Sequence, residues 1–501
     1  MQERALNTKT TAILVLALGV RLLGIASRPV WYDEAFSILF AEKGFGAMLY
    51  GTLAPTGAGS ADIHPLGYYT LLWLWMKGFG ESLITTRLLS ILAGLISVYL
   101  IYLIALEALS DTRTAQVSML FASLAPFQIH YSQEIRMYSF LAMWLLLATY
   151  AYQRGAKTGN WKWWLVFSIS AALAQYTHNL AAFYLILLAL WPVLQKNWRA
   201  VQAVTLAGTG ALVLYGPWLL QVPAQFSKIQ GAYWVERPGL SELFTLLLVY
   251  ITNTPIPGNW VVGALAIALL IVIGGLVQTI RYSSRSAARD GLWLLYLAFM
   301  PAILLFLFSQ WRPVYIERVL LPSGAIFCIW LAWVIRKTAL PKVAQYALLG
   351  LLAISSGLGG YQHLSYQGFP YGPFKELDVA LRQRIESEDI IIHSNKLSLI
   401  PAILFDRGLP QTFIGDEPGS RTDTLAPATQ QVLKVQAKKD IPSAADGAGR
   451  VWYIIYQRSI AEYQSAGYKT HPDIEYLDSH FTLKSTESWN GLQVFLYTRE
   501  P

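Results

Sequence analysis

Eleven apolar runs, separated by short polar connections, divide most of the first 360 residues of the chain. A helix that crosses a bilayer needs about 20 consecutive, mostly apolar residues. Some of the runs are shorter than this, so their bounds are approximate. The pattern predicts an all-α polytopic membrane protein with about eleven transmembrane helices, at 12–28, 83–106, 114–128, 138–152, 162–178, 180–195, 200–220, 259–280, 291–309, 315–335 and 342–359.

Lys and Arg residues indicate the direction in which these runs cross the membrane. The connections 154–162, 281–290 and 336–342 each carry three of them, and cytoplasmic loops are enriched in Lys and Arg. With these loops inside, the N-terminus is cytoplasmic and the chain after about residue 360 is extracytoplasmic. We expect a multi-pass protein of the cell inner (plasma) membrane, whose first run is a retained signal anchor.

The segment 29–82 begins and ends on the outer side in this topology. Its apolar piece, from His64 to Phe79, is roughly 15 residues long, which is short of the ~20 that a span needs. It therefore cannot be a simple crossing. The pattern predicts a surface-lying or re-entrant helix within a large outer loop.

Residues 361–501 differ in composition from the rest of the chain. They carry more acidic than basic residues, whereas 1–360 are strongly basic. Apolar, β-rich runs at 389–393, 451–456 and 492–497 alternate with helix-like stretches such as 375–385. We predict a C-terminal extracytoplasmic α/β domain, in which 415–449, rich in Gly, Pro, Thr, Asp and Ala, forms a long loop.

Overall composition agrees with a membrane protein. The chain is 54% hydrophobic and 14% charged, with a mean hydropathy of +0.41, which is too apolar for a soluble protein of 501 residues. The net charge of +8 is spread over short loops and forms no continuous basic face, so no nucleic-acid partner is expected. The single cysteine, Cys328, excludes an intrachain disulfide and is expected only to pack.

Polar residues in apolar surroundings gather on the outer face. Two carboxylates follow the first apolar run directly and have no evident compensating charge, which favours a role in proton transfer, metal binding or substrate binding over a role in stability. Taken singly, the histidine after the fifth run is equally well explained as a helix cap, and the Glu317–Arg318 pair as a structural salt bridge. The candidate site residues on this face are Asp33, Glu34, His64, Tyr131, Glu134, Arg136, His178 and Arg318.

Carboxylates beside arginines and aromatic residues at the outer membrane boundary suit an anionic, lipid-attached substrate. Arginine binds phosphate through two parallel hydrogen bonds, and a nearby carboxylate can deprotonate an acceptor hydroxyl or amine. The chain shows no Gly-rich phosphate loop and no metal-ligand spacing of His or Cys. We therefore expect no cofactor, leave a divalent cation open, and infer that the activated group arrives on a membrane lipid.

Several motifs together resemble a known family, the bacterial relatives of dolichyl-phosphate-mannose protein mannosyltransferases, which are glycosyltransferases of the GT-C fold. The resemblance covers most of 1–360, and 393–398 is similar to the extracytoplasmic domain of some members. Gly67 is a departure, because relatives more often have an apolar residue there. The motifs are Trp31-Tyr32-Asp33-Glu34, His64-Pro65-Leu66-Gly67-Tyr68-Tyr69, Arg87-Leu88-Leu89-Ser90, Tyr131-Ser132-Gln133-Glu134-Ile135-Arg136-Met137-Tyr138-Ser139 and Tyr176-Thr177-His178.

The resemblance implies that the protein transfers a sugar from a polyprenyl-phosphate donor to an extracytoplasmic acceptor, with inversion of the anomeric centre. Asp33, in the outer catalytic loop 29–82, would be the general base that activates the acceptor. Arg136 and Arg318 would stabilise the departing phosphate. Glu34 and Glu134 would position these groups or bind sugar hydroxyls. Neither the sugar nor the acceptor, whether protein, lipid or glycan, follows from the motifs.

Three other interpretations remain open at this stage. A transporter or flippase of lipid-linked glycans would use the charged residues to line a path, and Arg21, deep in the first run, fits that function best. Transporters usually show internal repeats, however, and none is clear here. A glycan polymerase or ligase that uses a lipid diphosphate would keep the outer site and change the donor. A sensor with an outer binding domain leaves the acidic pair unexplained.

Overall fold

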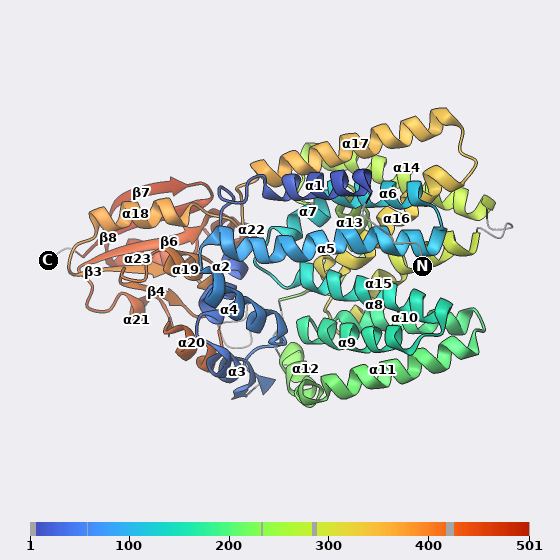
Figure 1. Cartoon of the computed structure of the whole chain (residues 1–501). Coiled ribbons are helices and arrows are strands. Elements are labelled where there is room, and N and C mark those ends of the chain that lie inside the picture. Colours follow the sequence, from blue (N-terminus) through green and yellow to red (C-terminus); the bar gives the residue numbers. More distant parts are fainter. Residues whose placement is uncertain (1–6, 58, 232–233, 283–287, 417–424, 500–501) are drawn as a thin grey trace.

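The computed structural model describes residues 7–57, 59–231, 234–282, 288–416 and 425–499. A long bundle of helices forms one part of the molecule, and a mixed α/β body lies at one end of it (Figure 1). The short helices of the segment 29–82 lie between the two, in blue in the picture. This arrangement brings the predicted outer loop and the C-terminal residues to the same end of the bundle.

Each of the eleven predicted runs coincides with a helix. Six of the described helices are long and apolar enough to cross a membrane, namely those within 83–109, 198–219, 258–282, 289–309, 317–337 and 342–365. The multi-pass membrane character is therefore supported, while the number of spans stays a prediction. The helices are α1 (Thr8–Leu22), α5 (Leu83–Leu109), α6 (Thr112–Leu124), α8 (Tyr138–Thr158), α9 (Trp161–Thr177), α10 (Ala181–Leu194), α11 (Trp198–Leu219), α14 (Gly258–Tyr282), α15 (Ala288–Ser309), α16 (Leu321–Lys337) and α17 (Lys342–Ser365).

Polar residues begin several of these helices at the predicted connections. The side chains of Ser82, Asp111 and Asn160 each accept a hydrogen bond from a backbone N–H of the first turn, which satisfies a donor that the helix itself leaves free. At the other end of α8, Gly159 adopts a left-handed conformation, with a φ of 66°, that glycine adopts without steric cost. Local capping thus fixes where the long helices stop.

The segment 29–82 contains the predicted non-crossing helix and two helices that the sequence analysis did not identify. The predicted helix is α4 (Gly67–Phe79), 13 residues long, which buries Tyr68, Tyr69, Leu72 and Met76 on one side. The two additional helices are α2 (Tyr32–Ala41) and α3 (Phe45–Leu53), followed by the two-residue strands β1 (Pro55–Thr56) and β2 (Gly59–Ser60). The additional short helices elsewhere are α7 (Pro126–Ser132), α12 (Val222–Gly231), α13 (Leu240–Ile251) and the 3-10 turn η1 (Glu317–Leu320).

Gly67 has a structural reason in this chain. A Cβ at this position would lie 2.6 Å from the backbone oxygen of Tyr176, at the end of α9. Backbone of α9 cannot move aside as a flexible side chain can, so only glycine permits α4 to approach this closely. The departure from the family pattern therefore sets how α4 packs against α9.

The C-terminal body is built on one six-stranded sheet in the order β5-β4-β3-β6-β8-β7. The first four strands in this order are parallel to one another. Strand β8 is antiparallel to both of its neighbours, β6 and β7. The strands are β3 (Asp389–His393), β4 (Gln411–Ile414), β5 (Ala437–Lys438), β6 (Arg450–Tyr456), β7 (Thr482–Trp489) and β8 (Leu492–Thr498). The helices are α18 (Phe374–Arg384), α19 (Lys396–Phe405), α20 (Pro427–Leu433), α21 (Ile441–Ala444), α22 (Gln457–Ser465) and α23 (Pro472–His480).

The α/β character predicted for this body is confirmed, and the three predicted strands coincide with β3, β6 and β8. The long loop predicted at 415–449 was wrong in part, because α20, β5 and α21 lie within it. Residues 417–424 of that loop lie outside the described residues. Segments this short bury too few residues to produce a clear hydrophobic period, so the sequence pattern does not reveal them.

The C-terminal body packs directly on the segment 29–82. Helix α19 contacts α2, and α20 contacts α3. The Thr429 hydroxyl donates to the backbone oxygen of Gly51 at 2.9 Å, and the Arg407 guanidinium lies 2.6 Å from the Glu42 carboxylate. The outer loop is therefore held between the membrane bundle and the sheet.

The orientation of the chain remains a prediction, and it can be tested with two fusions. A reporter that is active only outside the cytoplasm should be active when fused after Pro501 and inactive when inserted after Gly159, in the turn between α8 and α9, because positive loops stay inside. Enzyme activity of the reporter in intact cells is the measurement. The opposite pattern would place the candidate site on the cytoplasmic face and contradict the topology.

Candidate active site

Asp33 lies in the first turn of α2, where the free N–H groups of the helix favour a negative charge. Its Oδ2 is 3.2 Å from Nη1 of Arg318, at η1, and 3.5 Å from Nε of Arg136, in the connection between α7 and α8. The Asp33 side chain is 14% exposed. Three segments that are far apart in the sequence therefore place one carboxylate and two guanidinium groups together, with some access for a ligand.

Aromatic side chains hold both arginines in place. Nη1 of Arg136 donates to the Tyr69 hydroxyl at 3.0 Å. The guanidinium of Arg318 lies over the rings of Trp31, Tyr138 and Trp234, at 5.7, 5.2 and 5.7 Å from their centroids. Such stacking fixes the plane of a guanidinium and leaves its N–H donors directed along the edge. The guanidinium groups of Arg136 and Arg318 are thus held in position before any ligand binds.

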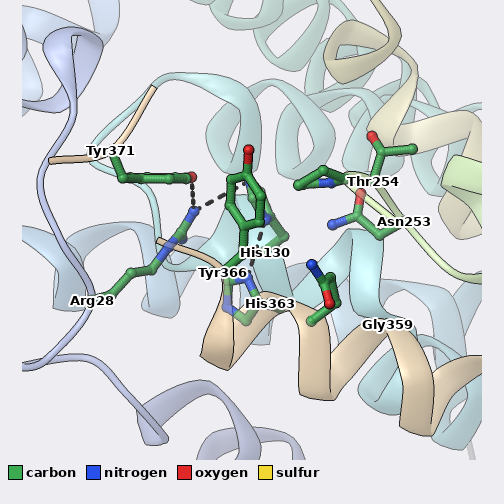
Figure 2. A pocket seen from close by; sticks show the side chains of 10 residues that line it. Arg28, His130, Asn253, Thr254, Gly359, His363, Tyr366 and Tyr371 are labelled. Carbon is green, nitrogen blue, oxygen red and sulfur yellow. Dashed lines mark hydrogen bonds between the residues drawn. The ribbon is translucent and has the colours of Figure 1, made fainter. Parts of the chain in front are cut away.

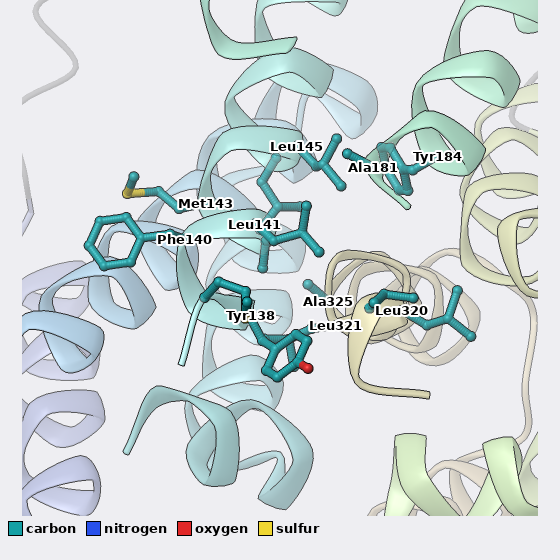
Figure 3. Close-up of a cluster of buried hydrophobic side chains, with 14 of the residues drawn as sticks. Tyr138, Phe140, Leu141, Met143, Leu145, Ala181, Tyr184, Leu320, Leu321 and Ala325 are labelled. Atoms are coloured by element: carbon teal, nitrogen blue, oxygen red, sulfur yellow. The ribbon is translucent and has the colours of Figure 1, made fainter. Parts of the chain in front are cut away.

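The start of α8 is positioned by a buried apolar cluster. Figure 3 shows Leu141 and Leu145 of α8 beside Tyr184 of α10 and Leu321 of α16, and all four are at most 3% exposed. Close packing of this kind tolerates little displacement. Tyr138 lies one turn before Leu141, at the start of α8. This packing therefore also holds the Tyr138 ring against Arg318.

Glu34 has a different environment from its neighbour. Its side chain is fully buried, and its two oxygens accept hydrogen bonds from Nε and Nη2 of Arg87 at 3.1 and 3.0 Å. Oε1 also accepts from the backbone N–H of Ile135 at 3.2 Å. The expectation of two uncompensated carboxylates was therefore wrong, because both have arginine partners that lie far away in the sequence.

The Glu34–Arg87 pair links the segments that carry the candidate site. Arg87, on α5, also donates to the backbone oxygens of Ile25, Arg28 and Pro29. Glu34 reaches Ile135, next to Arg136. The pair thus fixes the chain before α2 relative to the connection that carries Arg136. We infer that Glu34 positions the candidate site through these contacts.

Replacing Glu34 by glutamine should lower the stability of the protein by about 3–5 kcal/mol, because it leaves the buried Arg87 charge without its counterion. The measurement is the unfolding temperature of the purified protein together with its amount in the membrane. The control is Glu462→Gln, which breaks the exposed pair with Arg458 and should cost at most about 0.5 kcal/mol. Normal stability with lost activity in Glu34→Gln would instead place Glu34 in contact with substrate.

Glu134 belongs to a second buried cluster beside the Asp33 group. Its Oε1 lies 3.6 Å from Arg28 and 3.1 Å from Nε2 of His130. Arg28 also donates to the Tyr371 hydroxyl, and Nδ1 of His130 lies 3.1 Å from Nδ1 of His363. Burial raises the pKa of Glu134, although the nearby arginines Arg28 and Arg318 oppose this shift.

Part of this second cluster borders a small cavity, and Figure 2 shows Arg28, His130, His363 and Tyr371 around it together with Thr254. The volume of the cavity, about 10 Å³, is the space of about one water molecule. It is too small for a sugar. Because Tyr371 follows the last helix of the bundle, the cluster ties the connection to the C-terminal body to the site. Tyr131 packs against the His130 ring at its edge, with centroids 4.8 Å apart.

His64 and His178 lie together, and His178 lies beside Tyr138. Their rings contact edge to face at 5.8 Å, and the His178 ring is 6.1 Å from that of Tyr138. Nδ1 of His64 is 2.9 Å from Oδ1 of Asp62. Burial would raise the pKa of Asp62, but the His64 charge and its hydrogen bonds lower the pKa below its usual range.

Arg21 contributes to the bundle and not to a path. It is 1% exposed, its Nε donates to the Ser132 hydroxyl at 3.0 Å, and its other nitrogens donate to the backbone oxygens of Ala17, Ala122 and Ser123. Side chains and backbone that are satisfied in this way need no water or substrate. Arg21, the residue that best fitted a transporter, therefore links α1 to α6 and α7 through hydrogen bonds.

The sequence analysis did not single out several residues of this region. Asp62 was missed, although an acid two positions before His64 is visible in the sequence. Tyr69, Tyr138 and Trp234 were missed as arginine partners, because nothing in an aromatic-rich membrane sequence separates such a ring from an ordinary interface residue. In the part of the chain that the structure describes, no group of three or more His, Cys, Asp or Glu residues could hold a metal ion.

Comparison with known proteins adds a family relationship to this geometry. Residues 63–220 match the family model described as dolichyl-phosphate-mannose-protein mannosyltransferase. This stretch includes Arg136 and ends well before Arg318, and it begins after Asp33. The relationship predicted from the motifs is therefore confirmed for part of the chain.

The fold agrees over nearly the whole length. ArnT from Cupriavidus metallidurans in the apo state superposes with a TM-score of 0.63 at 14% identity, over 97% of each chain. The archaeal oligosaccharyltransferase AglB from Archaeoglobus fulgidus superposes with a TM-score of 0.51 at 13% identity, over 98% of this chain and 74% of AglB. The chain therefore shares the fold of these two proteins.

Among curated proteins, the chain is similar to an undecaprenyl phosphate-α-4-amino-4-deoxy-L-arabinose arabinosyl transferase of Pseudomonas aeruginosa (strain UCBPP-PA14), at 26% identity over 236 residues. The match covers 45% of this chain and 42% of the relative. The chain thus spans less than half the length of the curated relatives it matches. Neither this match nor the fold assigns a role to a particular side chain.

Proposed function

We propose that the protein is a membrane glycosyltransferase that moves a sugar from a polyprenyl-phosphate donor to an extracytoplasmic acceptor, with inversion. The observation that carries this proposal is the contact of Asp33 with Arg318 and Arg136 at a partly exposed position. A general base beside two fixed phosphate-binding forks is what such a transfer requires. Structural relatives support the donor class, since ArnT of the same fold has been determined bound to undecaprenyl phosphate.

The ion pairs of Asp33 suggest how the base is released. In the structure, both arginines are directed at the Asp33 carboxylate. A donor phosphodiester carries one negative charge, as a carboxylate does, and its two non-bridging oxygens can accept paired hydrogen bonds from arginine forks. When the donor enters, its phosphate takes over these guanidinium groups, and Asp33 becomes free to accept a proton. Donor binding therefore prepares the base.

Transfer then takes place in one displacement. The acceptor oxygen or nitrogen attacks the anomeric carbon while the bond from that carbon to the phosphate oxygen breaks. Asp33 accepts the proton of the acceptor, and the electron pair of the broken bond remains on the polyprenyl phosphate. Arg136 and Arg318 stabilise the charge that develops there. A single attack from the opposite face inverts the anomeric centre.

The remaining predicted residues surround this centre in the proposal. His64 and His178, which contact each other beside Tyr138, contact the donor or the acceptor, and Tyr131 and Glu134 support the site from the second cluster. The polyprenyl chain lies in the membrane beside the bundle. Neither the sugar nor the acceptor is specified by these contacts.

The test is to incubate purified protein with two radiolabelled donors, a polyprenyl-monophosphate sugar and a polyprenyl-diphosphate sugar, in the presence of a membrane extract as acceptor. The proposal predicts that sugar leaves the monophosphate carrier. Loss of sugar from the diphosphate alone would favour a polymerase or ligase. Movement of intact donor across vesicles without loss of sugar would favour a flippase.

A further inference from the structure

A second cavity, separate from the Asp33 group, lies at the junction of the C-terminal body with the segment 29–82. Its volume is about 550 Å³, which is within the range of small-molecule sites. It is bounded by Lys43, two residues after the end of α2, by α19 and the chain that follows it, and by the end of α20 and β5. We call it the junction pocket.

The lining of the junction pocket is strongly basic. Lys43, Arg407, Lys434 and Lys438 all contribute to it, and no carboxylate is among the described lining residues. Lys43 and Arg407 share one nearby counterion, Glu42, at 2.6 Å each. One carboxylate beside four cations leaves an excess of positive charge, which attracts an anion.

The rest of the lining fits a sugar-sized ligand. Gln411, Thr412 and Gln436 provide amide and hydroxyl groups, while Leu409 and Val435 provide apolar surface. Hydroxyl groups of a saccharide can exchange hydrogen bonds with the former, and its C–H faces can pack on the latter. A bare inorganic ion would use only the charges. The mixed lining therefore favours an anionic saccharide.

The pocket also has a defined relation to the candidate active site. Lys43 follows α2 and Asp33 begins it, so the two are joined by about ten residues of helix, or roughly 15 Å at 1.5 Å per residue. Both α2 and α19, which packs against it, border this junction. A ligand held in the pocket could extend another of its groups along α2 toward Asp33.

We propose that the junction pocket binds a phosphate- or carboxylate-bearing saccharide of the acceptor. Its role as an acceptor site rests on the proposed glycosyltransferase function, whereas the binding itself does not. The anionic group is held by the four cationic side chains of the lining, Lys43, Arg407, Lys434 and Lys438. The C-terminal body would then select acceptors by charge while the membrane part binds the donor.

The test uses full-length protein in lipid nanodiscs, with glucose 6-phosphate as the probe and glucose as its neutral counterpart. We expect glucose 6-phosphate to bind and glucose to bind at least tenfold more weakly. The double variant Lys434→Glu, Lys438→Glu should weaken binding of glucose 6-phosphate by about tenfold or more, since it removes two charge-assisted contacts. The variant Lys434→Gln, Lys438→Gln should show a smaller loss and serves if the first variant is unstable.

The matched control is Lys469→Glu, Lys484→Glu, which makes the same change of charge at exposed positions of the C-terminal body outside the pocket, the second of them on β7 at the opposite edge of the sheet from β5. It should bind glucose 6-phosphate normally. Weaker binding in phosphatidylglycerol nanodiscs than in phosphatidylcholine nanodiscs would support the pocket with a lipid headgroup as the source of the anion, and equal binding would support it with a free saccharide.

Equal losses in the pocket variant and the control would overturn the proposal, because general surface charge would then explain the binding. No binding of glucose 6-phosphate in either lipid, or unchanged binding in both Lys434/Lys438 variants, would overturn it as well. These results do not depend on sugar transfer. A failure of the glycosyltransferase assay with intact binding would thus affect the proposed function alone.

Discussion

Replacing Asp33 by asparagine is expected to slow sugar transfer by about 10²–10⁴-fold, the usual cost of removing a general base. Asparagine keeps the size of the side chain and can still accept a hydrogen bond, but it cannot accept the acceptor's proton. Because the Asp33 carboxylate pairs with Arg136 and Arg318, its removal also frees both guanidinium groups. Donor affinity should therefore be unchanged or higher. Initial rates and donor binding, measured on the same preparation, test both expectations.

The control for this prediction is Glu81→Gln, an exposed carboxylate in the same outer segment. It should leave rate and affinity unchanged. Near-normal transfer by Asp33→Asn would refute its role as base. A loss of donor affinity in Asp33→Asn would instead indicate that the carboxylate binds the sugar and does not compete with the phosphate.

Replacing Arg318 by lysine should lower transfer by about 10²–10³-fold, and Arg136→Lys should have a similar effect. Lysine keeps the charge but loses the planar fork and the stacking that fixes its direction. For Arg318 that stacking involves the rings of Trp31, Tyr138 and Trp234. The effect should lie mainly in turnover, because charge on the phosphate increases as its bond to the sugar breaks. Steady-state kinetics with a polyprenyl-monophosphate sugar are the measurement.

Arg312→Lys is the matched control. Arg312 lies in the connection between α15 and η1, just before the turn that carries Arg318, and also stacks on a ring, that of Trp311 at 4.6 Å, but it makes no contact with Asp33 among those that the structure records. Its replacement should leave transfer nearly unchanged. If all three lysine variants lose activity equally, a general requirement for arginine at this end of the bundle explains the result, and the assignment of Arg136 and Arg318 to the phosphate is contradicted.

The membrane helices could be predicted because burial in lipid imposes long apolar runs on the sequence. Each of the eleven runs has its helix, and 64–79 was correctly expected to form a short helix, α4. The predicted sidedness selected Asp33, Arg136 and Arg318 together, and the structure brings these three side chains into contact. One-dimensional patterns thus located the segments that carry the site.

Contacts between distant segments could not be predicted. Glu34 was expected to lack a compensating charge because its partner, Arg87, is 53 residues away and one sequence does not reveal such a pairing. Tyr69 contacts Arg136, 67 residues away, only because α4 packs beside the connection between α7 and α8. Short elements such as α20 and β5 were predicted as loop because they are stabilised by tertiary contacts. Their sequences are too short to show the hydrophobic period of a helix or a strand.

Asp33 acting as a base in a single displacement is the central claim, and the configuration of the product tests it most directly. The loss of activity in Asp33→Asn alone does not separate a base from a nucleophile, since both require the carboxylate. We would transfer a ¹³C-labelled sugar from a polyprenyl-monophosphate donor of known anomeric configuration and determine the anomeric configuration of the product by NMR. The account predicts inversion. Retention would show an even number of displacements, as expected for a covalent glycosyl intermediate, and would contradict it.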